Sequence, residues 1–169
     1  MPVARGRVPA LRHPCQMRRA LALLLAIVAL PAASALAQSV QQGTPRADQL
    51  VGTPGPDRIN ARGGNDDVRG KAGDDRLNGG RGDDVLAGDA GRDRLNGGPG
   101  ADILLGGAGN DIITGGPGPD VIIAGLGNDV VRARDGEVDT KISCGPGRDR
   151  VIADRGDHVG RDCEVVRRG

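Results

Sequence analysis

A period of nine residues constrains the fold of this chain more than any other feature of its sequence. Read in nines from Gly52, residues 52–132 form nine gapless rows: GTPGPDRIN, ARGGNDDVR, GKAGDDRLN, GGRGDDVLA, GDAGRDRLN, GGPGADILL, GGAGNDIIT, GGPGPDVII and AGLGNDVVR. In every row the fourth place is Gly, the sixth is Asp and the eighth is aliphatic. A short period repeated in this way predicts a solenoid, in which each repeat stacks on its neighbours.

Each row divides into a turn and a strand. The first six places are rich in Gly, Pro, Asn and Asp, which favour turns, and the last three form a minimal strand. Alternation along a strand sends place eight to one face and places seven and nine to the other. Because the turn reverses the chain, rows two apart should stack in parallel, with one coil spanning eighteen residues. The sequence therefore predicts an all-β fold, a parallel β-roll or two-sheet β-solenoid.

The composition agrees with a thin core. The chain has no Phe, Tyr or Trp, which excludes an aromatic-centred sandwich, an aromatic stacking platform for nucleic acid and an aromatic cage for cations. A core one aliphatic layer thick needs no aromatic ring. We expect it to consist of two facing ladders of place-eight side chains: Ile59, Leu77, Leu95, Ile113 and Val131 against Val68, Leu86, Leu104 and Ile122.

The place-six aspartates point to a metal. Rows two apart would lie about 4.8 Å apart, so their carboxylates would form two ladders of like charge. Neighbouring charges about 5 Å apart repel by roughly 3 kcal/mol at an effective dielectric of about 20, so a bare ladder should not fold without a cation. The alternative is that each Asp only caps its own turn. The place-six residues are Asp57, Asp66, Asp75, Asp84, Asp93, Asp102, Asp111, Asp120 and Asp129.

The available ligand atoms favour one metal. Carboxylate and carbonyl oxygens suit a hard cation, and an irregular set of many oxygens suits Ca²⁺ better than Mg²⁺. Place five often offers a further oxygen, and we expect these side chains to add to the metal sites: Asn65, Asp74, Asp83, Asn110 and Asn128.

These rows resemble the RTX, or haemolysin-type, calcium-binding nonapeptide GGxGxDxUx. The best matches are residues 97–105, 106–114 and 115–123, and the resemblance covers residues 52–132. It implies a parallel β-roll in which each Ca²⁺ lies between the turns of rows i and i+2, held by place-six Asp side chains and turn carbonyls. Nine rows would give about seven such sites.

The N-terminal segment has the features of a secretory signal. Residues 1–19 carry five Arg and no acid, an apolar run of eleven residues follows, and Ala35-Leu36-Ala37 offers a cleavage site. A membrane anchor is disfavoured because a spanning helix needs about 20 apolar residues. We therefore expect residues 1–37 to be removed and the protein to be secreted, with no membrane span. The mature chain would carry 18 basic and 22 acidic residues, which gives no case for nucleic-acid binding.

The segments that flank the rows are expected to close the roll. Residues 38–51 are interpreted as a leader with a degenerate capping repeat, and residues 133–169 as a C-terminal cap with one further repeat-like row, 144–152. The eleven residues 133–143 exceed a row by two and are expected to break the ladder. Two cysteines remain in an exported chain with a single His, so we expect a disulfide between Cys144 and Cys163 instead of a zinc site.

The expected function is that of a secreted, non-enzymatic Ca²⁺-binding β-roll that folds on binding extracellular Ca²⁺. No HExxH or GxSxG motif occurs, and the periodic aspartates are committed to metal. The alternative is a cell-surface or matrix adhesin that uses the roll as a rigid scaffold. The outward Arg58, Arg76 and Arg94 could contact a polyanionic cell-surface polymer. The outward aliphatic strip Val85, Ile103 and Val121 is covered either by residues 133–169 or by self-association.

Overall fold

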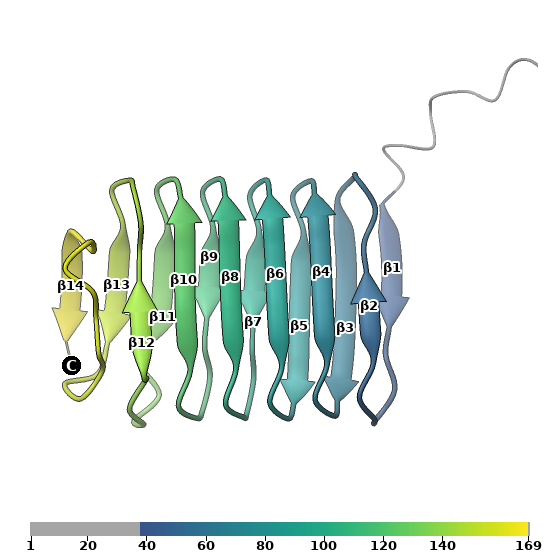
Figure 1. Cartoon of the computed structure of the whole chain (residues 1–169), viewed down its shortest axis with the longest axis horizontal. Coiled ribbons are helices and arrows are strands. Elements are labelled where there is room, and N and C mark those ends of the chain that lie inside the picture. The colour runs from purple at the N-terminus through teal and green to yellow at the C-terminus, as the bar shows by residue number, and fades with distance from the viewer. Residues whose placement is uncertain (1–37, 169) are drawn as a thin grey trace, which may run out of the picture. The chain divides into compact units, whose positions relative to one another are not determined.

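The structure is a computed structural model and describes residues 38–168, so the expected signal segment 1–37 lies outside the described residues. These residues form two parallel β-sheets that face one another (Figure 1). One sheet has eight strands, in the order β1 (Ser39–Gln42), β3 (Asp57–Gly63), β5 (Arg76–Arg81), β7 (Arg94–Asn96), β9 (Ile112–Thr114), β11 (Val130–Ala133), β13 (Arg150–Ala153) and β14 (Val165–Arg168). The other has six, in the order β12 (Lys141–Ser143), β10 (Val121–Leu126), β8 (Ile103–Ala108), β6 (Val85–Ala90), β4 (Asp67–Ala72) and β2 (Gln49–Val51).

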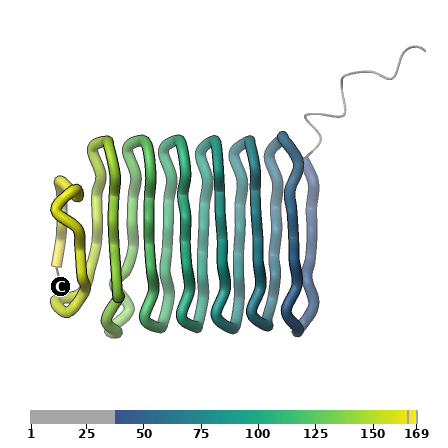
Figure 2. Tube along the Cα trace, viewed as in Figure 1, coloured from purple at the N-terminus to yellow at the C-terminus, as the bar shows by residue number. Residues whose placement is uncertain are grey.

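Strand register confirms the predicted coil of eighteen residues. In the eight-stranded sheet Ile59 lies opposite Leu77, and in the six-stranded sheet Leu86 lies opposite Leu104. From β1 to β13 consecutive strands alternate between the sheets, as the trace in Figure 2 shows, so strands two apart pair in parallel. The last strand, β14, pairs with β13 in the same sheet. The fold is therefore the expected all-β, two-sheet parallel β-solenoid.

The core is the single aliphatic layer that place eight predicts. All nine place-eight side chains are buried, with 2% exposure or less, and they line the space between the two sheets. Ile142 and Val151 extend the layer toward the C-terminus, and both are fully buried. Alternation along each strand places these residues inward and places seven and nine outward.

Several strands are longer than the three residues that the sequence predicted, although β2, β7, β9 and β12 have that length. The strands β4, β6, β8 and β10 each contain six residues, because the backbone of the next row's first three places continues the ladder. The reversal is concentrated near place four. Gly109, for example, has φ of 139°, and a Cβ there would collide with the carbonyl oxygen of Gly91 in the preceding coil. Both the left-handed backbone and the tight stacking of turns require glycine at this place.

The N-terminal residues add more structure than the sequence predicted. The expected capping row contributes β2, with Leu50 against the core, and residues of the leader form β1, which pairs with β3. Nothing in the nonapeptide pattern indicated this first strand, because it lies before the earliest recognisable row.

The expected break in the ladder after residue 132 is wrong. The strand offset changes from eighteen to twenty, with Val121 opposite Lys141 and Val130 opposite Arg150, and pairing then continues. The two extra residues are accommodated in the loop between β11 and β12. A local bulge helps, because the N–H groups of Thr140 and Lys141 both donate to the carbonyl oxygen of Asp120.

The predicted disulfide between Cys144 and Cys163 is present, with Cα atoms 5.2 Å apart. It ties the residue after β12 to the residues before β14. Asp162 supports the same edge, because its Oδ2 accepts the N–H groups of Cys144 and Gly145 at 2.9 and 2.8 Å. These hydrogen bonds, that from Gly145 first, lower the pKa of Asp162. A disulfide and a carboxylate thus close the last strand of the six-stranded sheet.

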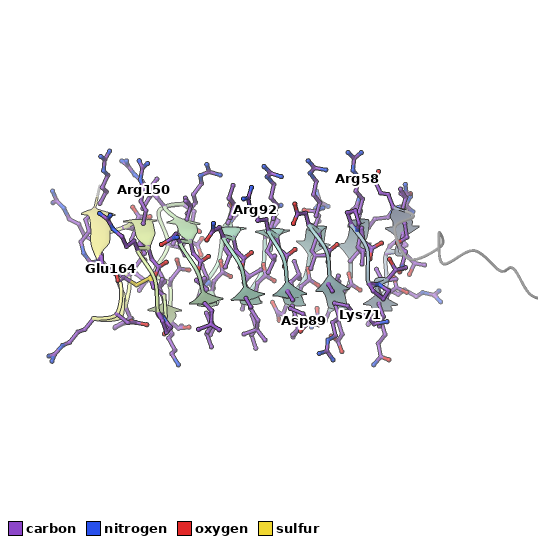
Figure 3. All side chains as sticks on the ribbon, turned by 90° about the horizontal axis from the view of Figure 1, so that it is seen from above. Arg58, Lys71, Asp89, Arg92, Arg150 and Glu164 are labelled. Carbon is purple, nitrogen blue, oxygen red and sulfur yellow. A yellow bond between two sulfur atoms is a disulfide. The ribbon has the colours of Figure 1, made fainter. Side chains whose placement is uncertain are left out.

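The two outer faces differ in chemistry. Arg58 and Arg150 project from the outer face of the eight-stranded sheet, and Lys71 and Asp89 from the opposite side (Figure 3). On the six-stranded sheet Val85 and Ile103 remain 36% and 41% exposed. Residues 133–168 do not cover this strip, because they extend both sheets at the end of the roll. Of the two alternatives for this strip, cover by the C-terminal segment is therefore wrong.

Candidate metal centre

The place-six aspartates lie at the ends of the turns, two residues before the inward place-eight side chains. All nine have exposures of 2% or less, so the carboxylates are as buried as the aliphatic core. A buried carboxylate is costly unless it is hydrogen-bonded, protonated or bound to a cation. The two oxygens of each group therefore have to be accounted for separately.

One oxygen of each carboxylate holds neighbouring coils together. The N–H of Asp75 donates to Oδ1 of Asp93 at 2.8 Å, and the N–H of Asp93 donates to Oδ1 of Asp111 at 2.8 Å. On the other turn edge the N–H of Asp84 donates to Oδ1 of Asp102 at 2.8 Å. From Asp66 onward each place-six carboxylate thus accepts from the aspartate eighteen residues earlier, whereas Asp57 accepts from the N–H of Ser39. The two predicted aspartate ladders exist, and their backbone and side chains form continuous hydrogen-bonded rows.

From Asp66 onward the second oxygen of each place-six carboxylate has no hydrogen-bond partner. Among residues 38–168, the ion pair within 4.0 Å joins Arg69 to Asp89, so no basic side chain neutralises the place-six carboxylates. An unpaired charge in such a position requires protonation or a cation. The buried Oδ2 atoms without a hydrogen-bond partner belong to Asp66, Asp75, Asp84, Asp93, Asp102, Asp111, Asp120, Asp129, Asp135, Asp139 and Asp149.

Burial and mutual repulsion make these carboxylates hard to ionise. Burial, assisted by the charges of neighbouring aspartates, raises the pKa of Asp93 and Asp120 to about 7. The same causes raise the pKa of Asp75 and Asp102 to about 6. Burial also raises the pKa of Asp129 to about 6. Hydrogen bonds from the preceding coil oppose the shift but do not cancel it, so the ladder favours protons or metal over free charge.

Where the first place of a row is Gly, it forms an oxygen-lined notch beside Oδ2 of that row's aspartate. A Cβ added at Gly97 would collide with Oδ2 of Asp102 and would lie 2.7 Å from the carbonyl oxygen of Gly115. Because glycine has no side chain, this position stays open between Oδ2 of Asp102 in the same row and the carbonyl oxygen of Gly115 in the next coil. A donor set made only of such oxygens is the one that Ca²⁺ prefers. The residues present therefore fit a calcium ion.

Two rows differ at this notch. Ala61 and Ala124 stand at place one where the other rows have Gly, and both are fully buried. Their methyl groups occupy the position that glycine leaves open. The rows that contain Asp66 and Asp129 therefore leave less room at this position than those with Gly at the first place.

The place-five side chains lie farther out, along the same turn edges. All five are exposed, and their oxygens accept backbone N–H groups of the next coil. Oδ1 of Asp74 accepts from Arg92 at 3.0 Å, and Oδ1 of Asn110 accepts from Asn128 at 2.8 Å. The structure brings three of them together with place-six residues in a depression of about 500 Å³ lined by Asp74, Asp93, Asn110, Asp111 and Asn128, among others. Asn65 and Asp83 border a similar depression with Asp66 on the other edge.

Capping within a single turn occurs at the N-terminal end. The N–H groups of Thr44 and Thr53 donate to Oδ2 of Asp48 and Asp57, each four residues ahead, at 2.5 Å. Burial would raise the pKa of Asp57, but hydrogen bonds from Ser39 and Thr53 outweigh it and lower the pKa. The capping alternative thus describes these first rows, whereas from Asp66 onward Oδ2 is unpartnered.

Several acidic residues outside the nine rows join the ladders. The N–H groups of Asp120, Asp129 and Asp139 donate to Oδ1 of Asp139, Asp149 and Asp157 at 3.0, 2.8 and 3.1 Å. Asp149 was visible as place six of the repeat-like row 144–152. Asp139 and Asp157 were not, because neither stands in a row with the glycine pattern. A search for Asp two or three residues before an aliphatic residue would have found Asp139.

Comparison with known protein families identifies the repeat. A family model of the RTX calcium-binding nonapeptide repeat, in four copies, matches residues 42–77, 69–104 and 105–137, which together span more than half of the chain. The chain therefore belongs to the RTX calcium-binding nonapeptide repeat family. Such repeats bind calcium and are not catalytic, and no catalytic domain is identified. No curated protein and no solved structure matches the chain significantly.

RTX repeats are typical of secreted proteins. Within residues 38–168, no helix has the length and apolar character needed to cross a membrane.

Proposed function

We propose that this chain is a secreted, non-enzymatic calcium-binding β-roll whose folding depends on extracellular Ca²⁺. The observation that carries the proposal is the row of buried Oδ2 atoms that have neither a hydrogen-bond partner nor a basic neighbour. Ca²⁺ between successive turns supplies the missing positive charge and takes oxygen ligands from the place-six carboxylates and turn carbonyls.

Metal binding then contributes to the stability of the fold. The core is one side chain thick, and repulsion along the carboxylate ladders opposes its formation at neutral pH. A ligand that binds only the folded state stabilises it by mass action, so binding energy becomes folding energy. Extracellular modules often bind Ca²⁺ at about 10⁻⁴–10⁻³ M, so the chain stays unfolded where Ca²⁺ is scarce and folds outside the cell.

The decisive experiment is far-UV circular dichroism of the mature chain during a Ca²⁺ titration. At neutral pH we expect a disordered spectrum in chelator and a β-sheet spectrum once Ca²⁺ reaches about 1 mM. Mg²⁺ at the same concentration is the control and should give much less strand signal, because it requires a regular octahedral site. No gain of strand signal with Ca²⁺ at any concentration would refute the proposal.

A pair of matched substitutions tests the place-six ligands. Asp93→Asn keeps an oxygen for the N–H of Asp75 but removes one buried charge, and we expect the Ca²⁺ midpoint to rise about tenfold. Asp67→Asn makes the same chemical change at an exposed position and should leave the midpoint unchanged. Asp83→Asn tests the place-five side chains, because a raised Ca²⁺ midpoint in this variant would mean that they also bind the metal. Equal midpoints for the Asp93 and Asp67 variants would exclude the place-six ladder as the calcium site.

Secretion is tested separately from calcium binding. Expression of the full chain in a secreting host, followed by N-terminal sequencing of the exported protein, should give a mature N-terminus at Gln38. Recovery of the protein only from the cells, with residues 1–37 still attached, would contradict this part of the proposal.

A second candidate function is that of a surface-binding module, in which the folded roll is a rigid scaffold. The supporting observation is the register of the eight-stranded sheet, which aligns Arg58, Arg76 and Arg94 on neighbouring strands. Beside these arginines, the side chain of Asn96 donates to Asn78 at 2.7 Å, and that of Asn78 donates to Asn60 at 3.0 Å. This hydrogen-bonded row of asparagines orders the surface next to the arginines. A row of guanidinium groups at the spacing of strands suits a linear polymer with regular negative charges.

Retention on a dextran sulfate column tests this candidate. The Ca²⁺-folded protein should elute at a higher salt concentration than a variant with Arg58, Arg76 and Arg94 changed to Ala. The matched control changes three exposed arginines of the C-terminal segment, Arg134, Arg155 and Arg161, and should elute like the wild type. Loss of retention in both triple variants would indicate a general charge effect and no specific surface.

Self-association through the exposed aliphatic strip of the six-stranded sheet is the remaining partner hypothesis. Ile103 stands at the middle of the strip and is 41% exposed. If the strip is a contact between copies, sedimentation in Ca²⁺ should show a dimer or larger species that Ile103→Thr converts to a monomer. A monomeric wild-type protein would exclude this contact.

A further inference from the structure

The coil that contains the two extra residues differs from the regular coils in its acidic side chains. Its loop follows β11 and ends at β12, and it protrudes from the turn edge in Figure 2. The N–H groups of Asp135 and Gly136 donate to Oδ2 of Asp154 at 3.0 and 2.7 Å, which holds the loop against the following coil. Oδ1 of Asp135 accepts the N–H of Glu137 at 2.8 Å, so the carboxylate itself is held in one orientation.

This loop places a third carboxylate beside two ladder aspartates. One carboxylate oxygen each of Asp120, Asp135 and Asp139 lies within 4.8 Å of those of the other two. Within the described part of the chain, these three form the one group in which three metal-ligating side chains approach so closely. The regular coils, by contrast, bring no more than two such side chains together.

The oxygens in this group are free to bind. Asp120 and Asp139 are fully buried, and each has an Oδ2 without a hydrogen-bond partner. Their Oδ1 atoms accept the N–H groups of Asp102 and Asp120, at 2.9 and 3.0 Å. The Oδ2 of Asp135 is also buried without a partner. No basic side chain lies within 4.0 Å of the three carboxylates in the described residues.

We propose that Asp120, Asp135 and Asp139 form a three-carboxylate cation site that binds Ca²⁺ more tightly than the regular positions of the roll. The identity of the ion rests on the proposed function, whereas the third ligand comes from the irregular loop alone. Calcium affinity rises with the number of charged ligands, and this site has one more than a position between two regular rows. Ion binding here also fastens the loop to the roll, because Asp135 belongs to the loop and Asp120 to the turn before β10.

Asp135→Asn in the whole chain is the test. Asparagine has the size of aspartate and keeps an oxygen for the N–H of Glu137, so the loop retains its internal hydrogen bond. The matched control is Glu137→Gln, an exposed neighbour in the same loop. Isothermal titration calorimetry with Ca²⁺ should show one class of tight binding sites, besides the weaker regular sites, in the wild type and in the control. In the Asp135 variant that class should be weakened about tenfold or lost, with the regular sites unchanged.

Europium provides a second measurement, which reports the ligands of the bound ion directly. The chain has no aromatic residue to sensitise lanthanide emission, so Eu³⁺ is excited directly. Its lifetimes in H₂O and D₂O report bound water, and the first ion bound should carry more water in the Asp135 variant than in the wild type, because water replaces the lost ligand. Circular dichroism at saturating Ca²⁺ should confirm equal strand content.

The outcomes separate this inference from the proposed function. If the wild type binds no Ca²⁺, both fail. If the wild type binds several ions in one class and the Asp135 variant has the same stoichiometry and affinity, the roll binds calcium but the three-carboxylate site does not exist. A tight class that survives in the variant would likewise overturn the inference alone.

Discussion

The central coils, residues 79–123, and the C-terminal coils, residues 133–168, build the same two-sheet stack by different means. The central coils repeat with a strict strand offset of eighteen residues, and no covalent link joins them. The C-terminal coils use offsets of twenty and fifteen, together with a disulfide. In the first region periodic sequence maintains the stack, and in the second, irregular segments are held in place by individual contacts.

This difference shows which requirement of the fold is strict. The loop lengths vary, but the hydrogen bond from one aspartate N–H to the Oδ1 of the aspartate in the next coil persists, from Asp102–Asp120 to Asp120–Asp139. The inward aliphatic residue persists as well, since Ile142 continues the column of Ile122. The roll therefore requires the aspartate and the inward aliphatic residue of each coil to align with those of the next coil. It tolerates insertions in the loops between coils.

The largest expected effect concerns pH in the absence of Ca²⁺. The raised pKa values of the central Asp93 and Asp102, about 7 and 6 against 3.8, mean that the folded chain keeps protons that the unfolded chain releases. The stability of the metal-free roll is therefore greatest below about pH 4 and is lost as the pH rises through about 6 to 7. The carboxylate of Asp162, in the C-terminal coils, has a lowered pKa, so its contribution to stability is instead lost as the pH falls.

Urea denaturation of the metal-free protein, followed by circular dichroism between about pH 4 and pH 8, measures this dependence. Saturating Ca²⁺ is the control and should reverse the trend, because calcium binds deprotonated carboxylates. Greater metal-free stability at about pH 8 than at about pH 5 would mean that the central carboxylates are not repelling one another.

Core truncation should distinguish the two regions next. Leu104 and Ile142 are both fully buried, but Leu104 lies in the middle of the six-stranded sheet and Ile142 in its terminal strand β12. Leu104→Ala should cost about 2–5 kcal/mol, because coils on both sides hold the cavity open. Ile142→Ala should cost less, since an edge strand can relax into the space. Urea denaturation in Ca²⁺ gives both values, and equal costs would contradict the distinction.

Removal of the disulfide should affect only the C-terminal coils. The Cys144→Ser, Cys163→Ser double variant frees a loop with a sequence separation of nineteen residues, and we expect a loss of about 2–4 kcal/mol. Hydrogen exchange with Ca²⁺ present should become faster in residues 141–168 and stay unchanged in 79–123. Faster exchange throughout the chain would show that the central coils depend on this cap.

The smallest expected effect lies in the N-terminal rows, where place two is not glycine. Lys71 has φ of 84°, whereas most of the central rows have glycine at the same place, for example Gly107 with φ of 111°; Asp89, with φ of 71°, is the central exception. Lys71→Gly should stabilise the roll by less than about 1 kcal/mol, because the relief of left-handed strain exceeds the entropy cost of glycine only slightly. Lys71→Ala is the control and should give no gain in melting temperature. A loss of stability with glycine would mean that the Lys71 side chain makes a compensating contact.

The sequence predicted the central coils almost completely and the ends only in part. Strict columns determine register, core and aspartate position at once, so Leu104 and Asp102 could be placed without coordinates. The strand β1 and the acidic contacts of Asp135 and Asp139 could not, because they lie in aperiodic segments where spacing along the chain does not determine proximity. Asp135 reaches Asp120 only through the loop conformation that Asp154 holds, and no linear pattern encodes that contact.

The alternation of strands between two sheets also limits how such a chain can change its length. Removal of eighteen residues, such as 88–105, deletes one full coil and leaves every later strand in its own sheet. Removal of nine residues, such as 88–96, moves all later strands to the opposite sheet and places the aliphatic Ile103 beside Arg76 on one outer surface. The distinct chemistry of the two faces is thus preserved only by duplications and deletions in even numbers of rows.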